Sequence, residues 1–253
     1  MEIYYEHYFG SMTQHDMIVC WVLAKNVLPQ EEKFALENGW REVYETEQGV
    51  WVQARSVRLK TSSFRTNKKV RKMLNPATGI ESNFKPASQC NLEELNEVYH
   101  KYAKYKNFPI EKNYIEDCLV DIDSKIIGEY REDGLLRAYV ICRMHDESAK
   151  AMTSLQFCWD YDKPQMFLGK FSMVKELQFA IENKLDWVYI GDGYQKICEY
   201  KCSFPGFQFW TGRKWISDIN LYKELIKNDD KVKTVQELDK LSKDYMENKT
   251  FEK

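Results

Sequence analysis

The stretch from 167 to 194, FLGKFSMVKELQFAIENKLDWVYIGDGY, decides how the rest of the chain is interpreted. Its apolar residues recur at helical spacing after Leu168-Gly169, which predicts an amphipathic helix. The run WVYIG is short and apolar, as is typical of a buried strand, and it ends in the glycine-rich turn 191–194. The two loops, one before the helix and one after the strand, lie where α/β proteins commonly place chemistry.

The segments before this unit predict an antiparallel meander. Three strands are expected between 125 and 161, with Asp133-Gly134 as the first turn. Ahead of them, 91–107 predicts a helix capped by Asn91, with Glu94 completing a capping box, and 111–121 predicts another helix. Helices, a meander, one crossover helix and further strands make an α+β protein with a mixed, largely antiparallel sheet and flanking helices. This order resembles the fold of the N-acetyltransferases.

The two ends of the chain are interpreted more coarsely. Residues 1–28 receive no assignment, and the strand-rich stretch 204–216 precedes a tail with two charged helices. Between them the pattern predicts three elements, which are a short helix at 29–40, a hairpin turning at 47–49, and a basic helix at 66–74 with Thr66 as its N-cap. The expected organisation is an N-terminal region (1–78), a catalytic domain (79–219) and a helical tail (220–253).

Composition limits the function classes. The chain has 253 residues, is 43% hydrophobic and carries a net charge of −2, so any nucleic-acid site must be a local patch. The most apolar stretch near the N-terminus has about eight residues, too few for a bilayer span, so we expect a cytoplasmic protein without a membrane segment. Seven scattered cysteines and four distant histidines favour reduced thiols over a metal site.

Gly169 allows two interpretations. A glycine before a helix is often only part of a turn. It also lets a ligand approach the free N–H groups of a helix N-terminus, which favour anions such as a coenzyme A pyrophosphate or the phosphates at the 3′ end of a tRNA. The loop matches the coenzyme pattern Q/R-x-x-G-x-G/A only loosely, because its spacing is one residue longer and Phe171 replaces the last small residue.

A family resemblance rests on segments that occur in one order. WDYDKP (159–164), LGKFSMVKEL (168–177) and YIG (189–191) resemble the aromatic run, the S-L-G-x-Y-S-x-L-R-E-I motif and the Y-x-x-G-Y motif of the aminoacyl-tRNA–protein transferases. ICEYKCSF (197–204) is similar to the family's K-M-x-Y-K-x-x-F/Y segment, and 39–74 is similar to its upstream G-F-R and basic segments.

The sequence departs from the family beside these motifs. Phe167 replaces the leading serine, the loop after Gly191 reads Asp192-Gly193-Tyr194, and the Lys-Met pair is absent. The first forty residues lack the paired cysteines of such enzymes, so no metal is implied there.

The resemblance implies an arginyl- or leucyl-transferase that uses aminoacyl-tRNA as co-substrate, needs no cofactor, and modifies the N-terminal amine of a protein or peptide. The reaction requires the amine and the ester to be aligned and the developing oxyanion to be stabilised. Candidate catalytic residues are Asp192, Tyr194 and Tyr200. Candidate substrate-binding residues are Phe167, Leu168, Gly169, Ser172, Gly191 and Lys201. The segment 58–72 holds seven basic residues and no acid, and its candidate tRNA contacts are Arg58, Arg65, Lys68, Lys69 and Arg71.

Two alternatives stay open. One is an acyl-coenzyme-A-dependent N-acyltransferase of the same fold, for which the coenzyme loop is a poor match. The other is a non-catalytic relative that binds tRNA or an N-terminal residue, which the altered loop after Gly191 favours.

Overall fold

The centre of the larger sheet is the meander that the sequence predicts. The computed structural model describes residues 2–12, 15–42 and 50–229. The meander consists of β7 (Lys125–Glu132), β8 (Leu135–Met144) and β9 (Ala151–Trp159). Along β8, Val140 and Cys142 face one core while Tyr139 and Ile141 face the other. This strand is apolar throughout because both of its faces are covered.

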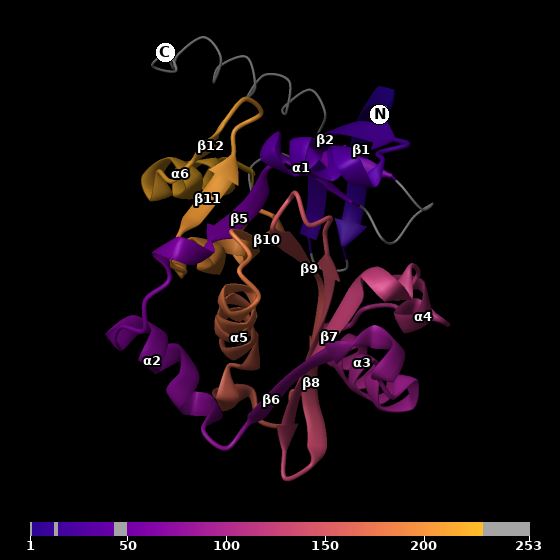
Figure 1. Cartoon of the computed structure of the whole chain (residues 1–253), viewed down its shortest axis with the longest axis vertical. Helices are drawn as coiled ribbons and strands as arrows, with labels where there is room; N and C mark the ends of the chain where they lie inside the picture. The colour runs from indigo at the N-terminus through magenta and orange to yellow at the C-terminus, as the bar shows by residue number, and fades with distance from the viewer. Residues whose placement is uncertain (1, 13–14, 43–49, 230–253) are drawn as a thin grey trace.

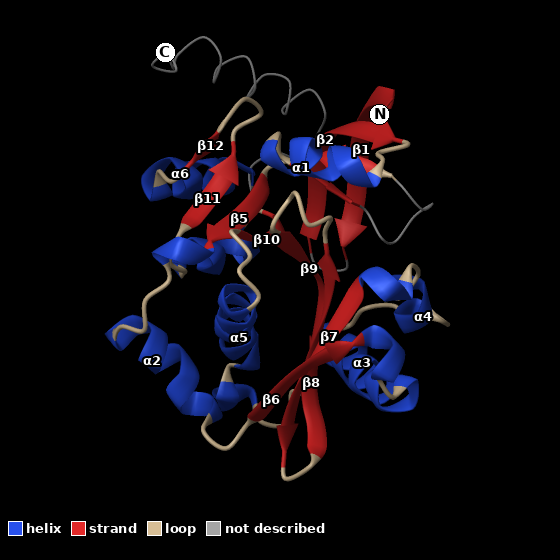
Figure 2. Cartoon of the chain, viewed as in Figure 1, coloured by secondary structure: helices blue, strands red, loops and turns tan. Residues whose placement is uncertain are grey.

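Eight strands form the larger sheet, in the order β12-β11-β5-β10-β9-β8-β7-β6 (Figures 1 and 2). The remaining strands of this sheet are β5 (Ser56–Lys60), β6 (Glu81–Pro86), β10 (Trp187–Asp192), β11 (Phe207–Trp210) and β12 (Trp215–Ile216). Only β9 and β10 pair in parallel, and the other neighbours are antiparallel. The predicted mixed, largely antiparallel α+β fold, with its N-acetyltransferase-like order, is confirmed.

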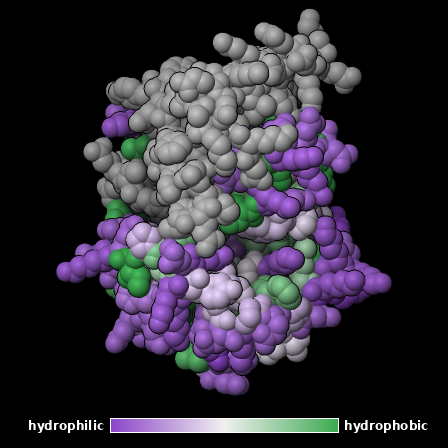
Figure 3. Space-filling view, turned by 180° about the vertical axis from the view of Figure 1, so that it is seen from behind, coloured by the Kyte–Doolittle hydropathy of each residue, from purple (hydrophilic) through white to green (hydrophobic). Residues whose placement is uncertain are grey.

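Helices cover both faces of this sheet. The first core lies under α5 (Leu168–Glu182), α2 (Lys68–Leu74) and α6 (Ile219–Asp229). The second core lies under α3 (Leu92–Lys106) and α4 (Tyr114–Cys118). Seen from behind, hydrophilic residues predominate on the described surface (Figure 3). On the described part of this face, apolar side chains are therefore mostly withdrawn from the surface.

A smaller four-stranded sheet precedes these elements, in the order β1-β2-β4-β3. Its strands are β1 (Glu2–Met12), β2 (His15–Lys25), β3 (Trp40–Glu42) and β4 (Trp51–Gln53), with α1 (Glu32–Glu37) beside them. Ala24, Leu36, Trp40 and Trp51 share a third core with Tyr189 of β10. The small sheet therefore packs where β10 begins.

Several local predictions need correction. The N-cap of α2 is Asn67, whose side chain accepts from the N–H groups of Lys69 and Val70, so the assignment of Thr66 was wrong. Asn91 caps α3 as predicted, but Glu94 pairs with Arg131. The hairpin of β3 and β4 is confirmed, although its turn lies outside the described residues. The run that follows this turn was predicted as one strand, but it forms two, β4 in the small sheet and β5 in the larger sheet.

The ends of the chain contribute more than the sequence indicated. Residues left unassigned form the antiparallel pair β1–β2. Of the tail, α6 is described and buries Tyr222 in the first core, while 230–253 lie outside the described residues. Since β5 lies between β10 and β11, the proposed boundaries at 78 and 219 do not coincide with a division of the sheet or of the core.

Two further findings concern the described part only. Its six cysteines with described side chains form no disulfide with one another, and no group of three or more His, Cys, Asp or Glu residues there is placed to hold a metal ion. None of its helices is long and apolar enough to span a membrane.

Candidate functional site

The two parallel strands of the sheet separate soon after they meet. β9 and β10 pair only from Trp187 opposite Ala151 to Tyr189 opposite Thr153, yet both strands continue. Each has an irregularity just beyond the last pair, at 154–156 in β9 and at 190–191 in β10. Such bulges redirect strands and are frequent beside active sites. The loops that leave these two strand ends carry the predicted site residues.

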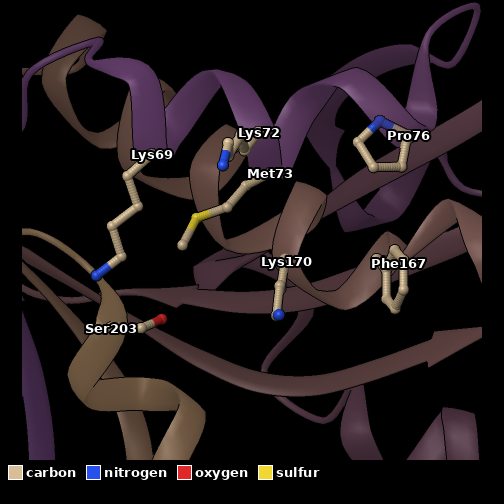
Figure 4. A pocket seen from close by; sticks show the side chains of 7 residues that line it. All are labelled: Lys69, Lys72, Met73, Pro76, Phe167, Lys170 and Ser203. Atoms are coloured by element: carbon tan, nitrogen blue, oxygen red, sulfur yellow. The ribbon is translucent and has the colours of Figure 1, made fainter.

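A lysine-lined pocket of about 330 Å³ lies at the N-terminus of α5 (Figure 4). The residues around it are Lys69, Lys72, Met73, Pro76, Phe167, Lys170 and Ser203. Three of these seven are cationic and none is acidic. Figure 4 shows the lysines of α2 and Lys170 of α5 on facing walls. The hydroxyl oxygen of Ser203 is buried there and has no hydrogen-bond partner among the described residues.

The first turn of α5 leaves donors available at this pocket. Phe167 has φ +50° and is 53% exposed, and its carbonyl accepts from the N–H groups of Lys170 and Phe171. The N–H groups of Leu168 and Gly169 come earlier in the helix, where the helix itself provides no acceptor. Helix N-termini with nearby cations attract phosphate groups. The pocket is therefore suited to an anion.

The packing of α5 does not require a glycine at 169. A Cβ added to Gly169 would meet only the Phe157 ring, at 3.5 Å, which is an ordinary van der Waals distance. Its φ does not lie in the left-handed range. The glycine therefore leaves space above the helix N-terminus, as close approach of a ligand requires.

Two other predicted residues of this segment face the core. Leu168 is 1% exposed. Ser172 is equally buried, and its hydroxyl lies 2.7 Å from Glu176 Oε1 and 2.9 Å from the Tyr130 hydroxyl. Burial raises the pKa of Glu176, while the hydroxyls of Ser172 and Ser154 oppose that shift. Ser172 thus belongs to a buried polar chain beneath the site.

Lys201 fixes the end of β10. Its ammonium donates to the carbonyls of Ile190, at 2.7 Å, and Asp192, at 2.5 Å, and lies within 3.7 Å of a Cβ added to Gly191. Gly191 itself has φ +73°, which only glycine adopts without strain. The predicted residues 191, 192 and 201 are therefore brought together, with Lys201 holding backbone rather than exposed to a ligand.

The three predicted catalytic residues have different surroundings. Both carboxylate oxygens of Asp192 accept from Arg41 at 2.6 Å. The Tyr194 hydroxyl accepts from the N–H of Arg55 at 2.8 Å, and burial raises its pKa. Tyr200 is 44% exposed, although burial among neighbouring groups still raises its pKa. Tyr200 thus has the most exposed side chain of the three, whereas the other two support the loop.

The predicted basic patch divides in the structure. Arg58 is 8% exposed, its guanidinium lying 3.6 Å from the ring centre of Trp187 and 4.1 Å from that of Trp215. It is therefore enclosed and turned away from solvent. Arg65 is exposed and donates to the carbonyls of Ser62 and Phe64. Lys68, Lys69 and Arg71 lie exposed on α2, and of these Lys69 borders the pocket.

Several residues around the site were not among the predicted ones. Lys170 follows Gly169 directly and Lys72 lies one turn after Lys69, so helical spacing would have found both. Arg41 and Arg55 gave no signal, because each reaches the site from a distant part of the chain. Ser203 lies only two residues after the predicted Lys201, within the segment 197–204.

Comparisons with known proteins give one family match over part of the chain. Residues 90–211 match the family model described as "Arginine-tRNA-protein transferase, C terminus". No curated protein sequence matches the chain significantly.

Among solved structures, the chain is similar to the C-terminal domain of a putative lysylphosphatidylglycerol synthetase from Agrobacterium fabrum, with 16% identity and a TM-score of 0.46 over 67% of this chain and 54% of that one. It is also similar to L-PGS from Bacillus licheniformis, with 13% identity and a TM-score of 0.44 over 63% of this chain and 49% of that one. A third similar structure is FemX, with 8% identity and a TM-score of 0.45 over 75% of this chain and 79% of that one. The chain thus spans about half the length of the first two. The family resemblance drawn from the motifs is confirmed by this model match, which covers residues 90–211 of the 253 in the chain.

Proposed function

We propose that this protein is an aminoacyltransferase that moves an amino acid of the arginine or leucine class from aminoacyl-tRNA to the N-terminal amine of a protein or peptide. The observation that carries this proposal is the lysine-lined pocket at the N-terminus of α5, to which Phe167, Lys170 and Ser203 contribute from the region that matches the family. Aminoacyl-tRNA is the co-substrate, no further cofactor enters the proposal, and the cytoplasm is the proposed compartment.

The pocket receives the phosphates at the 3′ end of the tRNA in this proposal. Lys69 and Lys72 of α2 and Lys170 of α5 supply positive charge, and Gly169 allows close approach to the helix N-terminus. The remaining exposed cations of α2, Lys68 and Arg71, extend this surface for the adjoining phosphates. Arg58 takes no part, because it is enclosed between two tryptophan rings.

The aminoacyl ester then lies toward the ends of β9 and β10. The acceptor amine attacks the ester carbonyl, the new C–N bond forms, and the bond to the ribose oxygen breaks. The amine loses a proton and the ribose oxygen gains one, so no covalent intermediate with the protein is needed. The chain's contribution is alignment of the two reactants and stabilisation of the developing negative charge.

We assign separate roles to the two polar side chains at these strand ends. Tyr200, which is exposed, donates its hydroxyl proton in a hydrogen bond to the developing oxyanion. Asp192, whose two oxygens keep lone pairs beyond those used by Arg41, accepts a hydrogen bond from the acceptor amine. Lys201 and Tyr194 hold the loop that presents Asp192.

The test is transfer of labelled amino acids to a panel of peptides with different N-terminal residues. Total charged tRNA is the donor in one arm and labelled acetyl-coenzyme A in the other. We expect the peptides to receive label from charged tRNA and not from acetyl-coenzyme A. Ribonuclease treatment should abolish this transfer, and Tyr200→Phe should reduce its rate at least tenfold. The labelled amino acid and peptide then identify donor and acceptor class.

Two outcomes would overturn the proposal. Transfer from acetyl-coenzyme A alone would assign the pocket to the coenzyme pyrophosphate. Binding of tRNA without transfer from either donor would make the chain a non-catalytic relative.

A further inference from the structure

A stack of aromatic rings lies where α3 ends, outside the site described above. The ring centres of Tyr105 and Tyr161 are 3.6 Å apart, and their planes are inclined by 8°. Trp159 packs against Tyr161 at 4.0 Å, and Tyr102 lies 6.1 Å from it. Tyr161 is thus enclosed by neighbours and holds Tyr105 in one orientation.

Tyr105 is the solvent-facing end of this stack. Its side chain is 59% exposed, although Tyr161 covers one of its faces. Among the residues that the structure describes, four aromatic side chains are classed as exposed: Phe34, Tyr105, Phe167 and Tyr200. Two of these four lie against the segment that follows β9, since Phe167 ends that segment and Tyr105 stacks on Tyr161 at its start.

The stack adjoins the proposed reaction site. Tyr102 and Tyr161 both pack against the first core, which also contains Leu168 and Phe171 of α5. Only five residues of chain separate Tyr161 from Phe167 at the lysine-lined pocket. A nucleic-acid strand held at the pocket therefore has aromatic surface within reach.

The charges around the stack suit a phosphate backbone. From His100 to Asn107 the chain has three lysines and no acid. The ammonium of Lys106 lies 5.4 Å from the Tyr161 ring centre. Lys101 and Arg137 pair with Asp160, and also with Glu97 and Glu132 respectively, while Asp162 follows Tyr161 in the chain. The cations that remain beside the rings are Lys104 and Lys106. Aromatic rings beside cations are the usual means of binding unpaired nucleotides without base specificity.

We propose that the outer face of Tyr105, supported by Tyr161, is a stacking platform for an unpaired base of a single-stranded RNA end. A base there continues a stack that already exists, so little ordering of the protein is required. The inference rests on the proposed function, because the RNA end it binds is that of the tRNA donor. It adds a base-binding site to the phosphate-binding pocket.

The experiment compares two RNA hairpins that carry no amino acid, one with a single-stranded 3′ ACCA end and one with a blunt end. Binding is measured by fluorescence anisotropy at fixed salt. We expect Tyr105→Ala to weaken binding of the hairpin with the overhang by about 5- to 150-fold and to leave blunt-end binding unchanged. Tyr105→Phe retains the wild-type affinity, because stacking needs the ring and not the hydroxyl.

The matched control is Phe34→Ala, which removes an equally exposed ring, 59%, from α1. It leaves both affinities unchanged. Circular dichroism verifies the fold of each variant. Equal affinity of Tyr105→Ala and wild-type protein for the hairpin with the overhang would overturn the inference, as would an equal loss for the blunt hairpin.

Failure of this inference is distinguishable from failure of the proposed function. If Tyr105→Ala transferred the amino acid with the wild-type KM for aminoacyl-tRNA, the stacking platform would be refuted and the proposed transferase activity would be supported. Loss of overhang binding in that variant, in a protein that transfers nothing, would establish the platform without the enzyme.

Discussion

Arg41 holds both carboxylate oxygens of Asp192, with Nε–Oδ1 and Nη2–Oδ2 distances of 2.6 Å. The two residues are 151 positions apart, and the pair connects β3 of the small sheet to the end of β10. The neighbouring residue Glu42 pairs in turn with Arg143 of β8. The small sheet therefore helps to position the loop that carries the candidate catalytic residues.

Replacing Arg41 with alanine will destabilise the protein by roughly 1.5–3 kcal/mol, because Asp192 loses two charge-assisted hydrogen bonds in a partly buried place. The measurement is the free energy of unfolding in urea. Arg65→Ala, which removes an exposed arginine that bonds to nearby carbonyls, is the control and should change stability by less than about 0.5 kcal/mol. Equal effects of the two substitutions would contradict the structural role of the pair.

Gly169→Ala will separate folding from binding. The substitution should leave stability unchanged or increase it by up to about 1 kcal/mol, because alanine is the better helix former and its Cβ has room. Affinity for RNA should nevertheless fall at least tenfold, since the Cβ occupies the space above the helix N-terminus. Thermal unfolding and anisotropy measure the two effects.

Gly193→Ala is the contrasting variant, because its Cβ would lie 2.7 Å from Val57 and 2.8 Å from Tyr222, which should destabilise the fold. Wild-type RNA affinity in Gly169→Ala would show that the glycine serves only the turn.

The three lysines of the pocket should set part of the salt dependence of RNA binding. For a single strand, each phosphate that the protein neutralises adds about 0.7 to the steepness of log K against log salt. Alanine at Lys69, Lys72 and Lys170 together should therefore flatten the slope by up to about 2. Lys33→Ala, an exposed lysine of α1, should leave it unchanged. If the triple substitution left the slope unaltered, the three lysines would not neutralise RNA phosphates in the pocket.

Glu176→Gln should alter the pH dependence of stability. Burial raises the pKa of this carboxyl above its ordinary value of 4.5. At pH values between the ordinary and the raised pKa, the folded state keeps a proton that the unfolded state has released, so wild-type stability falls as pH increases. Glutamine keeps an acceptor for Ser172 and does not titrate. We expect the variant to gain stability relative to wild type as the pH rises from about 4 to about 8.

Melting temperatures across that range measure the effect of Glu176→Gln. Glu182→Gln, an exposed glutamate at the end of the same helix, is the control and should show the wild-type pH profile. A Glu176→Gln profile parallel to that of the wild type would show that the buried carboxyl does not titrate abnormally.

Local patterns determined the elements that are long or strongly periodic. The helix at 168–182, the strand after it and the three-stranded meander follow from hydrophobic spacing and from turn residues such as Asp133-Gly134. Asn91 was recognisable as a cap because its side chain bonds within its own helix turn. The motifs at 159–204 were sufficient to indicate the family.

Only the tertiary structure decided which candidate residues are buried and which are exposed. Arg58 lies in a basic run but is enclosed by Trp187 and Trp215, and Ser172 lies in a family motif but faces Glu176 in the core. Lys72, Lys170 and Ser203 converge on one pocket from three separate segments. Sequence spacing describes neighbours along one helix or strand, whereas burial and convergence depend on packing between segments that are far apart in the chain. For this reason the sequence was sufficient for the fold class and the family resemblance, whereas the positions of the candidate site residues depend on the packing of α2, α5 and the small sheet.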